Sequence, residues 1–146
     1  MKLLLDTHVA LWIVSEPERL SRKALRAFRS SEELFLSIAS LWELAKKIAV
    51  GKLQLAPGWA RNLPSTLVRD GVQTLPVQPD DCDALVGLPL QKNRDPFDRM
   101  LLAQALQRDL ALMTIDKNMK GHGVKVVWLK ARNHSQQSWR FNALRH

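Results

Sequence analysis

Four acidic residues lie in separate segments of the chain, each beside an apolar stretch: Asp6, Glu43, Asp98 and Asp116. A set of carboxylates, whose donor atoms are oxygens, suits a hard divalent cation such as Mg²⁺ or Mn²⁺. Crowded carboxylates without a cation would repel one another and raise their pKa values. A bound cation removes that penalty, lowers the pKa of water and neutralises a scissile phosphate, so the set favours phosphodiester hydrolysis.

Three of these acids also have a purely structural interpretation. Asp6 stands before a predicted helix and is a suitable helix cap. Asp98 completes an Asp-Pro-Phe-Asp capping box that Asp95 would open. Asp116 follows an apolar run and suits a turn. These alternatives stay open on spacing alone.

Glu43 is harder to explain as a structural residue. It lies in the otherwise apolar stretch Ser-Leu-Trp-Glu-Leu-Ala, where an acid is costly to bury without a partner. The alternative is a partly exposed glutamate that pairs with Lys47 at position i+4.

The elements that must position these acids follow from hydrophobic periodicity. Strands are predicted over residues 2–5, 34–36, 72–77, 111–114 and 124–128. Helices are predicted over 7–14 with Thr7 as the cap, from Ser21, from Ser37 or Ser40 to Gly51, over 57–71, and over 80–86 with Asp80 as the cap. A last, long helix is predicted to begin at Asp95-Pro96. Its buried stripe comprises Phe97, Leu101, Leu102, Ala105 and Leu106. Pro76 indicates an edge position or an early end for its strand. Because strands alternate with helices, the predicted class is a three-layer α/β/α fold with a central, mainly parallel sheet.

The predicted sheet brings the acids to one rim. Asp6 and Asp116 directly follow strands, Glu43 lies one to two turns into the helix after the second strand, and Asp98 lies in the first turn of the long helix. Ligands of open parallel sheets bind at the carboxyl ends of the strands. We therefore expect the four carboxylates to share one site.

Composition limits the remaining possibilities. The chain has 146 residues and is 46% hydrophobic, which suits one domain with a packed core. It contains no run of about 18 apolar residues, so no membrane partner is expected. Its single cysteine, Cys82, excludes an internal disulfide and favours a reducing, cytoplasmic setting. The net charge of +8 favours polyanionic partners such as nucleic acid.

Four segments together resemble the PIN domain, specifically the VapC-type toxins of bacterial toxin–antitoxin pairs. They are Leu3-Leu4-Leu5-Asp6-Thr7-His8, then Ser40-Leu41-Trp42-Glu43-Leu44-Ala45 through Lys47 to Gly51-Lys52-Leu53, then Arg94-Asp95-Pro96-Phe97-Asp98-Arg99-Met100-Leu101-Leu102-Ala103-Gln104-Ala105, and Thr114-Ile115-Asp116. They follow the order of the family over residues 1 to about 128.

The resemblance implies a ribonuclease dependent on Mg²⁺ or Mn²⁺, with RNA as substrate, a cognate antitoxin that silences it, and a homodimer. Asp6, Glu43 and Asp98 match the three core acids of the family and Asp116 matches the fourth. Asp95 matches a motif residue outside that set and is kept as a cap.

Four further residues are assigned to substrate contacts: Thr7, Lys47, Arg99 and Thr114. Lys47 and Arg99 would bind RNA phosphates, although solvated helix faces or ion pairs explain such cations equally well. The tryptophans are expected in the core or at an interface rather than as stacking platforms: Trp12, Trp42, Trp59 and Trp128.

The resemblance places a nuclease domain over residues 1–129 and leaves a basic tail over 130–146, expected to be disordered. Asn93 departs from the histidine that many relatives have before the Arg-Asp-Pro-Phe-Asp-Arg motif. Two other functions stay open: a non-catalytic basic module that binds RNA or protein, whose acids are only caps and ion pairs, and a DNA or flap nuclease with the same acids.

Overall fold

A single parallel sheet of five strands organises the computed structural model, which describes residues 1–89 and 94–128. The strand order is β3-β2-β1-β4-β5. The strands are β1 (Lys2–Leu5), β2 (Glu33–Ser37), β3 (Val72–Leu75), β4 (Ala111–Thr114) and β5 (Val126–Trp128). The edge position predicted from Pro76 is confirmed for β3.

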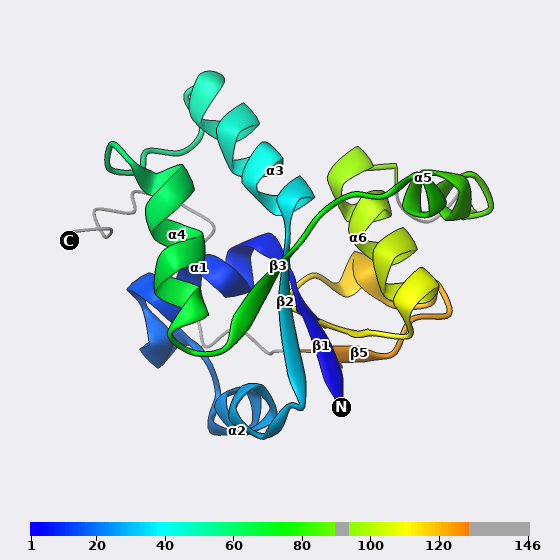
Figure 1. The fold of residues 1–146 in the computed structure, drawn as a ribbon, viewed down its shortest axis with the longest axis horizontal. Helices are drawn as coiled ribbons and strands as arrows, with labels where there is room; N and C mark the ends of the chain where they lie inside the picture. Colours follow the sequence, from blue (N-terminus) through cyan, green and yellow to red (C-terminus); the bar gives the residue numbers. More distant parts are fainter. Residues whose placement is uncertain (90–93, 129–146) are drawn as a thin grey trace.

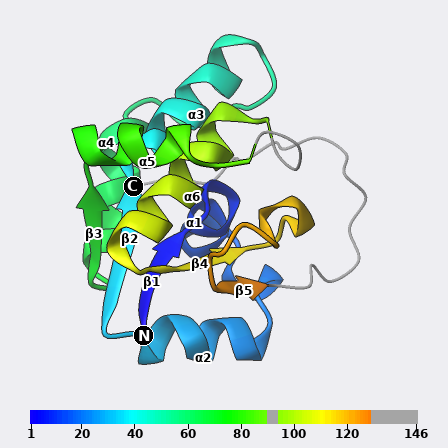
Figure 2. The ribbon, with the colours of Figure 1, turned by 90° about the vertical axis from the view of Figure 1, so that its right-hand side faces the viewer.

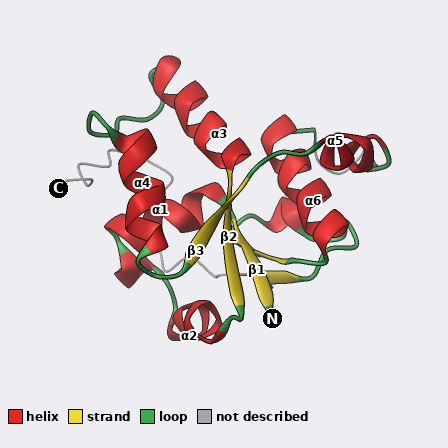
Figure 3. Cartoon of the chain, viewed as in Figure 1, coloured by secondary structure: helices red, strands yellow, loops and turns green. Residues whose placement is uncertain are grey.

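Helices cover both faces of this sheet. They are α1 (Thr7–Ser15), α2 (Arg22–Ser30), α3 (Ile38–Ala49), α4 (Trp59–Val68), α5 (Pro79–Val86) and α6 (Pro96–Arg108), with short 3₁₀ turns η1 (Pro17–Arg19) and η2 (Lys117–Met119). Figures 1 and 3 show α1, α2 and α4 on one side of the sheet, and α5 and α6 on the other. The predicted three-layer α/β/α fold is confirmed.

Side chains of the central strand alternate between two cores. Leu3 and Leu5 of β1 pack into the cluster that includes residues of α1, α2 and α4. Leu4 points to the opposite cluster, formed mainly with α6 and β4. This period of two is what a strand buried on both faces requires, and it explains the continuous leucine run of β1.

The sheet register aligns the ends of the strands that precede the acids. Leu5, the last residue of β1, pairs with Leu36 of β2 and with Met113 of β4. The segments that follow these three strands therefore leave the sheet at the same edge. Figure 2 shows α3 beyond that edge, at the top of the view.

Some predicted boundaries were wrong. The cap of α1 is not Thr7 but Asp6, as its structural interpretation predicted, because the Asp6 carboxylate accepts the Thr7 N–H. The cap of α5 is Gln78 rather than Asp80. Leu106, predicted in the buried stripe of α6, is 41% exposed, because its neighbour in the adjoining loop is Gly123, which has no side chain to cover it.

Three predictions fall outside the described residues: the domain boundary at residues 129 and 130, the disordered tail, and the consequence of Asn93. Within the part of the chain that is described, no helix is both long enough and apolar enough to cross a membrane.

Candidate active site

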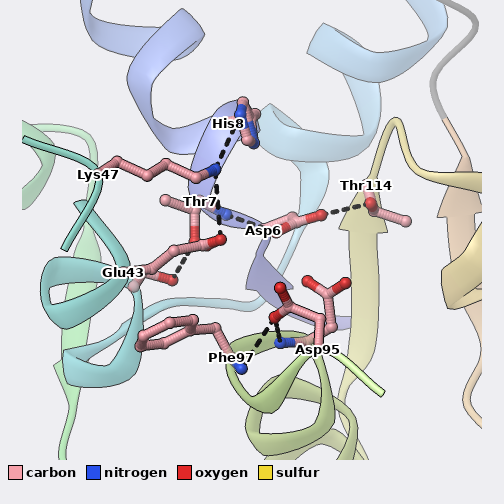
Figure 4. Close-up of polar contacts among 10 residues, drawn as sticks. Asp6, Thr7, His8, Glu43, Lys47, Asp95, Phe97 and Thr114 are labelled. Carbon is pink, nitrogen blue, oxygen red and sulfur yellow. Dashed lines mark hydrogen bonds and ion pairs between the residues drawn. The ribbon is translucent and has the colours of Figure 1, made fainter. Parts of the chain in front are cut away.

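Asp6 lies at the junction of β1 and α1, with its carboxylate only 5% exposed. One oxygen accepts the backbone N–H of Thr7 at 2.7 Å, and the other accepts the hydroxyl of Thr114 from the end of β4. Figure 4 shows the Asp6 side chain held between these two groups. The carboxylate is thus oriented by both neighbouring segments.

Burial raises the pKa of Asp6 from 3.8 to about 6. The hydrogen bonds from Thr114 and Thr7 oppose this rise, and the negative charges of Glu43 and Asp116 add to it. A carboxylate in this setting is costly to ionise unless a cation comes close.

Glu43 projects from α3 and is 6% exposed. Its Oε2 lies 3.4 Å from the Lys47 ammonium nitrogen, so the predicted i,i+4 pair is present. Its Oε1 is buried and has no hydrogen-bond partner. An unsatisfied buried oxygen of a charged group costs several kcal/mol in general, so the ion pair alone does not explain this carboxylate.

Two further acids come from the start of α6. Asp95 caps the helix by accepting the N–H groups of Phe97 and Asp98 at 2.9 and 3.0 Å. One carboxylate oxygen from each of Glu43, Asp95 and Asp98 can lie within 4.8 Å of the other two. The predicted cap is confirmed, and the same residue brings a third oxygen to the cluster.

Asp116 follows β4 and caps η2 by accepting the N–H of Asn118 at 2.9 Å. Its own N–H donates to Thr114 Oγ at 3.0 Å, which links it to the residue that holds Asp6. The structural interpretation of Asp116 as a turn residue is therefore correct. It also lines the same cleft as the other acids.

All four predicted acids border one cleft of about 690 Å³. Its lining comprises Asp6, His8, Glu43, Lys47, Asp95, Asp98, Ile115, Asp116, Lys117 and Asn118. The predicted convergence is thus observed, although the catalytic and metal-binding roles of these acids remain predictions.

Lys47 and His8 lie side by side in the lining of this cleft. Their Nζ and Nε2 atoms are 3.5 Å apart. Burial, together with the nearby Lys47 charge, lowers the pKa of His8 from 6.5 to about 4. His8 is therefore neutral at physiological pH, and Lys47 supplies the cationic charge at this point.

The donor set fits a hard divalent ion. Three carboxylate oxygens approach one another, the buried Oε1 of Glu43 has no partner, and a fourth carboxylate, Asp6, is buried in the same cleft. Oxygen donors alone are what Mg²⁺ and Mn²⁺ prefer. A cation here would satisfy the orphaned oxygen and offset the mutual repulsion of the acids.

Three residues assigned to substrate contacts do not line the cleft. Arg99 is 7% exposed and donates to the backbone carbonyls of Leu85, Leu88 and Pro89. This position contradicts an RNA-phosphate contact and makes Arg99 a structural residue that ties the end of α5 to α6.

Thr7 and Thr114 are also buried rather than open to substrate. The Thr7 hydroxyl donates to Ser40 Oγ at 2.9 Å, and the Thr114 hydroxyl donates to Asp6. Both residues act on the site through Asp6 and its surroundings. Lys47 alone of the four lines the cleft.

Asp95 is the site residue that sequence reasoning missed. Its position before Pro96 fully accounted for it as a helix cap, so nothing in its spacing required a second role. The signal that was available is geometric: a cap at N-cap and an acid at N3 of the same helix lie on neighbouring positions of its first turn.

Comparisons with known proteins agree with this geometry. A family model described as PIN domain matches residues 3–124. The chain is 34% identical over 122 residues to Ribonuclease VapC22 of Mycobacterium tuberculosis, with 82% of this chain and 90% of that protein covered.

Solved structures share the fold at low sequence identity. VapBC2 from Rickettsia felis, bound to a DNA fragment from its promoter, matches with a TM-score of 0.67 and 12% identity, covering 88% of this chain and 99% of that one. DNA-bound VapBC from Salmonella typhimurium matches with a TM-score of 0.61 and 17% identity, covering 86% and 96%.

Proposed function

Because this chain belongs to the PIN domain family, we propose that it is a metal-dependent endoribonuclease and the toxin of a toxin–antitoxin pair. The observation that carries the proposal is the meeting of four acids from distant segments in one cleft, with Asp95 beside them. A module that only binds RNA has no need to bury a carboxylate oxygen without a partner, as Glu43 Oε1 is, at a substrate surface.

Glu43, Asp95 and Asp98 would hold a Mg²⁺ or Mn²⁺ ion, with Asp6 and Asp116 facing the same space. When bound, the ion supplies a water of lowered pKa and positive charge against the scissile phosphate.

The proposed reaction is an in-line hydrolysis. A water oxygen bonds to phosphorus, the bond from phosphorus to the 3′ oxygen breaks, and a proton passes to that oxygen. The products carry a 5′-phosphate and a 3′-hydroxyl. No side chain forms a covalent bond to the substrate.

The chain's own side chains prepare the cleft for this reaction. The Thr114 hydroxyl and the Thr7 amide fix the orientation of Asp6. The Lys47 ammonium, held beside Glu43 and His8, is positioned to attract a phosphate oxygen. We assign it to substrate binding.

The partners follow from the relatives. VapC22 is named a ribonuclease, and the resemblance to VapC-type toxins implies a cognate antitoxin. We extend both properties to this chain: RNA as the substrate, and an antitoxin as the inhibitor. A homodimer acting in the cytoplasm completes the proposal.

Sequencing of RNA ends after expression of the chain tests this function. We expect new 5′-phosphate ends at defined sites with wild-type protein, and none with Asp98→Asn or when a chelator is added to the purified enzyme. Parallel digestion of single-stranded DNA tests for a DNA nuclease. Ends that persist undiminished in Asp98→Asn, or in chelator, would contradict the proposal.

A further inference from the structure

We propose that Trp42 is a stacking platform for an RNA base next to the scissile phosphate, and that Lys46 binds the backbone of the same nucleotide. The inference deepens the proposed function and rests on it. It assigns a substrate-recognition role to a residue outside the acidic cleft.

The exposure of Trp42 is the starting observation. Its side chain is 68% exposed, which excludes the core position expected from the sequence and leaves the alternative of a position at an interface. Tryptophan is highly buried on average in folded proteins, so an exposure this high at Trp42 is the observation to be explained. Trp42 lies within α3, so the helix holds its backbone in a fixed position.

Phe97 holds the indole from one side. The two ring centroids are 5.1 Å apart and the planes are inclined at 83°, an edge-to-face contact. Phe97 itself is buried, and Figure 4 shows its ring reaching from α6 toward α3. The contact orders the tryptophan while most of its surface stays open, as a stacking platform requires.

Lys46 adds a cation to this pair. Its ammonium lies 5.4 Å from the centre of the Phe97 ring, and it follows Trp42 by one helical turn. The surface formed by Trp42, Phe97 and Lys46 thus combines an open aromatic group with a positive charge.

This surface does not line the acidic cleft itself, but it is joined to the cleft through neighbouring residues on the same two helices. Trp42 directly precedes Glu43 on α3, and Phe97 directly precedes Asp98 on α6. Both acids line the cleft. A nucleotide whose phosphate lies at the acids would therefore have its neighbouring base within reach of the indole.

The charges favour a nucleotide over a protein surface as the occupant. A nucleotide offers a flat aromatic base to Trp42 and a phosphate to Lys46, so both groups gain a partner. An apolar protein face laid over Trp42 would remove water from the Lys46 ammonium without replacing it. Lys47, one residue further along, extends the positive charge toward the cleft.

Binding of a fluorescein-labelled single-stranded oligouridine, measured by anisotropy in chelator, tests the proposal without turnover. The dissociation constant for Trp42→Ala should be about tenfold higher than for wild type, because stacking on one base has roughly that effect. Trp42→Phe should restore most of the affinity. Val68→Ala, which changes an exposed apolar residue on α4, should leave it unchanged.

A second probe separates stacking from any general effect on the surface. A series of oligonucleotides, each lacking one base, should contain one position at which the loss of the base weakens binding to wild type. Loss of the base at that position should not weaken binding to Trp42→Ala any further. Equal penalties in both proteins at every position would overturn the proposal. Wild-type affinity in Trp42→Ala would also overturn the proposal. If the protein still cleaves RNA in that case, the proposed function would survive.

Sedimentation velocity covers the competing occupant, a second copy of the chain. Wild type and Trp42→Ala should have the same mass. A dimer that dissociates in the variant would show that a protomer covers Trp42, and it would overturn the stacking role. If wild type cleaves no RNA, the proposed function fails, yet the binding result with the abasic probes still decides whether Trp42 stacks on bases.

Discussion

Asp6 combines burial, a negative charge and two hydrogen bonds, and this combination sets its pH dependence. Its pKa in the folded protein, about 6, lies above the ordinary value of 3.8. The folded state therefore binds more protons than the unfolded state between these values. The stability that protonated Asp6 confers is present below pH 3.8 and is lost as the pH rises through 6.

Metal-free wild-type protein should thus lose stability relative to Asp6→Asn as the pH rises. Between pH 5 and 7.5 the unfolding free energy of wild type should fall by about 1 kcal/mol relative to that of Asp6→Asn. Urea unfolding in chelator at both pH values measures it. A stability difference that stays constant with pH would show that Asp6 ionises normally.

The same substitution should abolish function. Asp6→Asn keeps the size of the side chain but removes its charge, so we expect RNA cleavage to fall by at least about 100-fold. Circular dichroism should show the fold retained, with unfolding in chelator at least as cooperative as in wild type. An Asp6→Asn preparation that cuts at the wild-type rate would refute the assignment.

Three of the acids were predictable from sequence because they follow strands or lie in the first turn of a helix at one end of a parallel sheet, and Glu43 because it interrupts an apolar helical stretch. The roles of the neighbouring polar residues were not. Thr7 and Thr114 are small, and their hydroxyls can be buried because each makes a hydrogen bond within the site. Arg99 is long enough to reach three backbone carbonyls away from the cleft. Residue type alone does not show in which direction such side chains point.

At the scale of elements, the start of α6 serves both stability and the site. Asp95→Ala removes the cap and should cost about 1 kcal/mol of unfolding free energy. Asp95→Asn keeps a capping oxygen and should be nearly neutral. Both variants should bind Mn²⁺ more weakly, which calorimetry can measure. Unchanged Mn²⁺ affinity in both would leave Asp95 as a cap only.

Arg99 connects α6 to the end of α5, and its loss should affect stability rather than RNA binding. Arg99→Lys cannot reproduce three hydrogen bonds and should cost roughly 1–3 kcal/mol. In Arg99→Gln, which removes the positive charge, the salt dependence of RNA affinity should not change, because no phosphate contact is lost. A shallower salt dependence in Arg99→Gln would restore the phosphate contact rejected above.

Helix caps show where sequence rules succeeded and where they failed. Ser21, Ser37 and Asp95 cap their helices as predicted or as one of two alternatives. Thr7 and Asp80 are not the caps: the Asp6 carboxylate accepts the Thr7 N–H, and α5 begins after Gln78, whose N–H donates to the Asp81 carboxylate. Capping preferences overlap between neighbouring polar residues, so they locate a helix start only to within a residue or two.

For the whole molecule, the alternation of apolar runs and amphipathic stretches was sufficient to predict the parallel sheet and its three layers. The order of the strands places β1 at the centre, between β2 and β4, and this order brings Asp6 beside Thr114 and Glu43. Trp42 was expected in the core or at an interface, and its exposure excludes only the core. Its apolar neighbours in the sequence do not show whether the helix has an open face at this position.

The central claim is that the acidic cleft binds a divalent cation, and the thermal midpoint with added Mn²⁺ tests it most directly. Binding to the native state alone raises the midpoint. We expect a concentration-dependent rise for wild type and for Asp83→Asn, which changes an exposed acid on α5. Glu43→Gln and Asp98→Asn should show little or no rise. Equal rises in all four proteins, or none in wild type, would contradict the account.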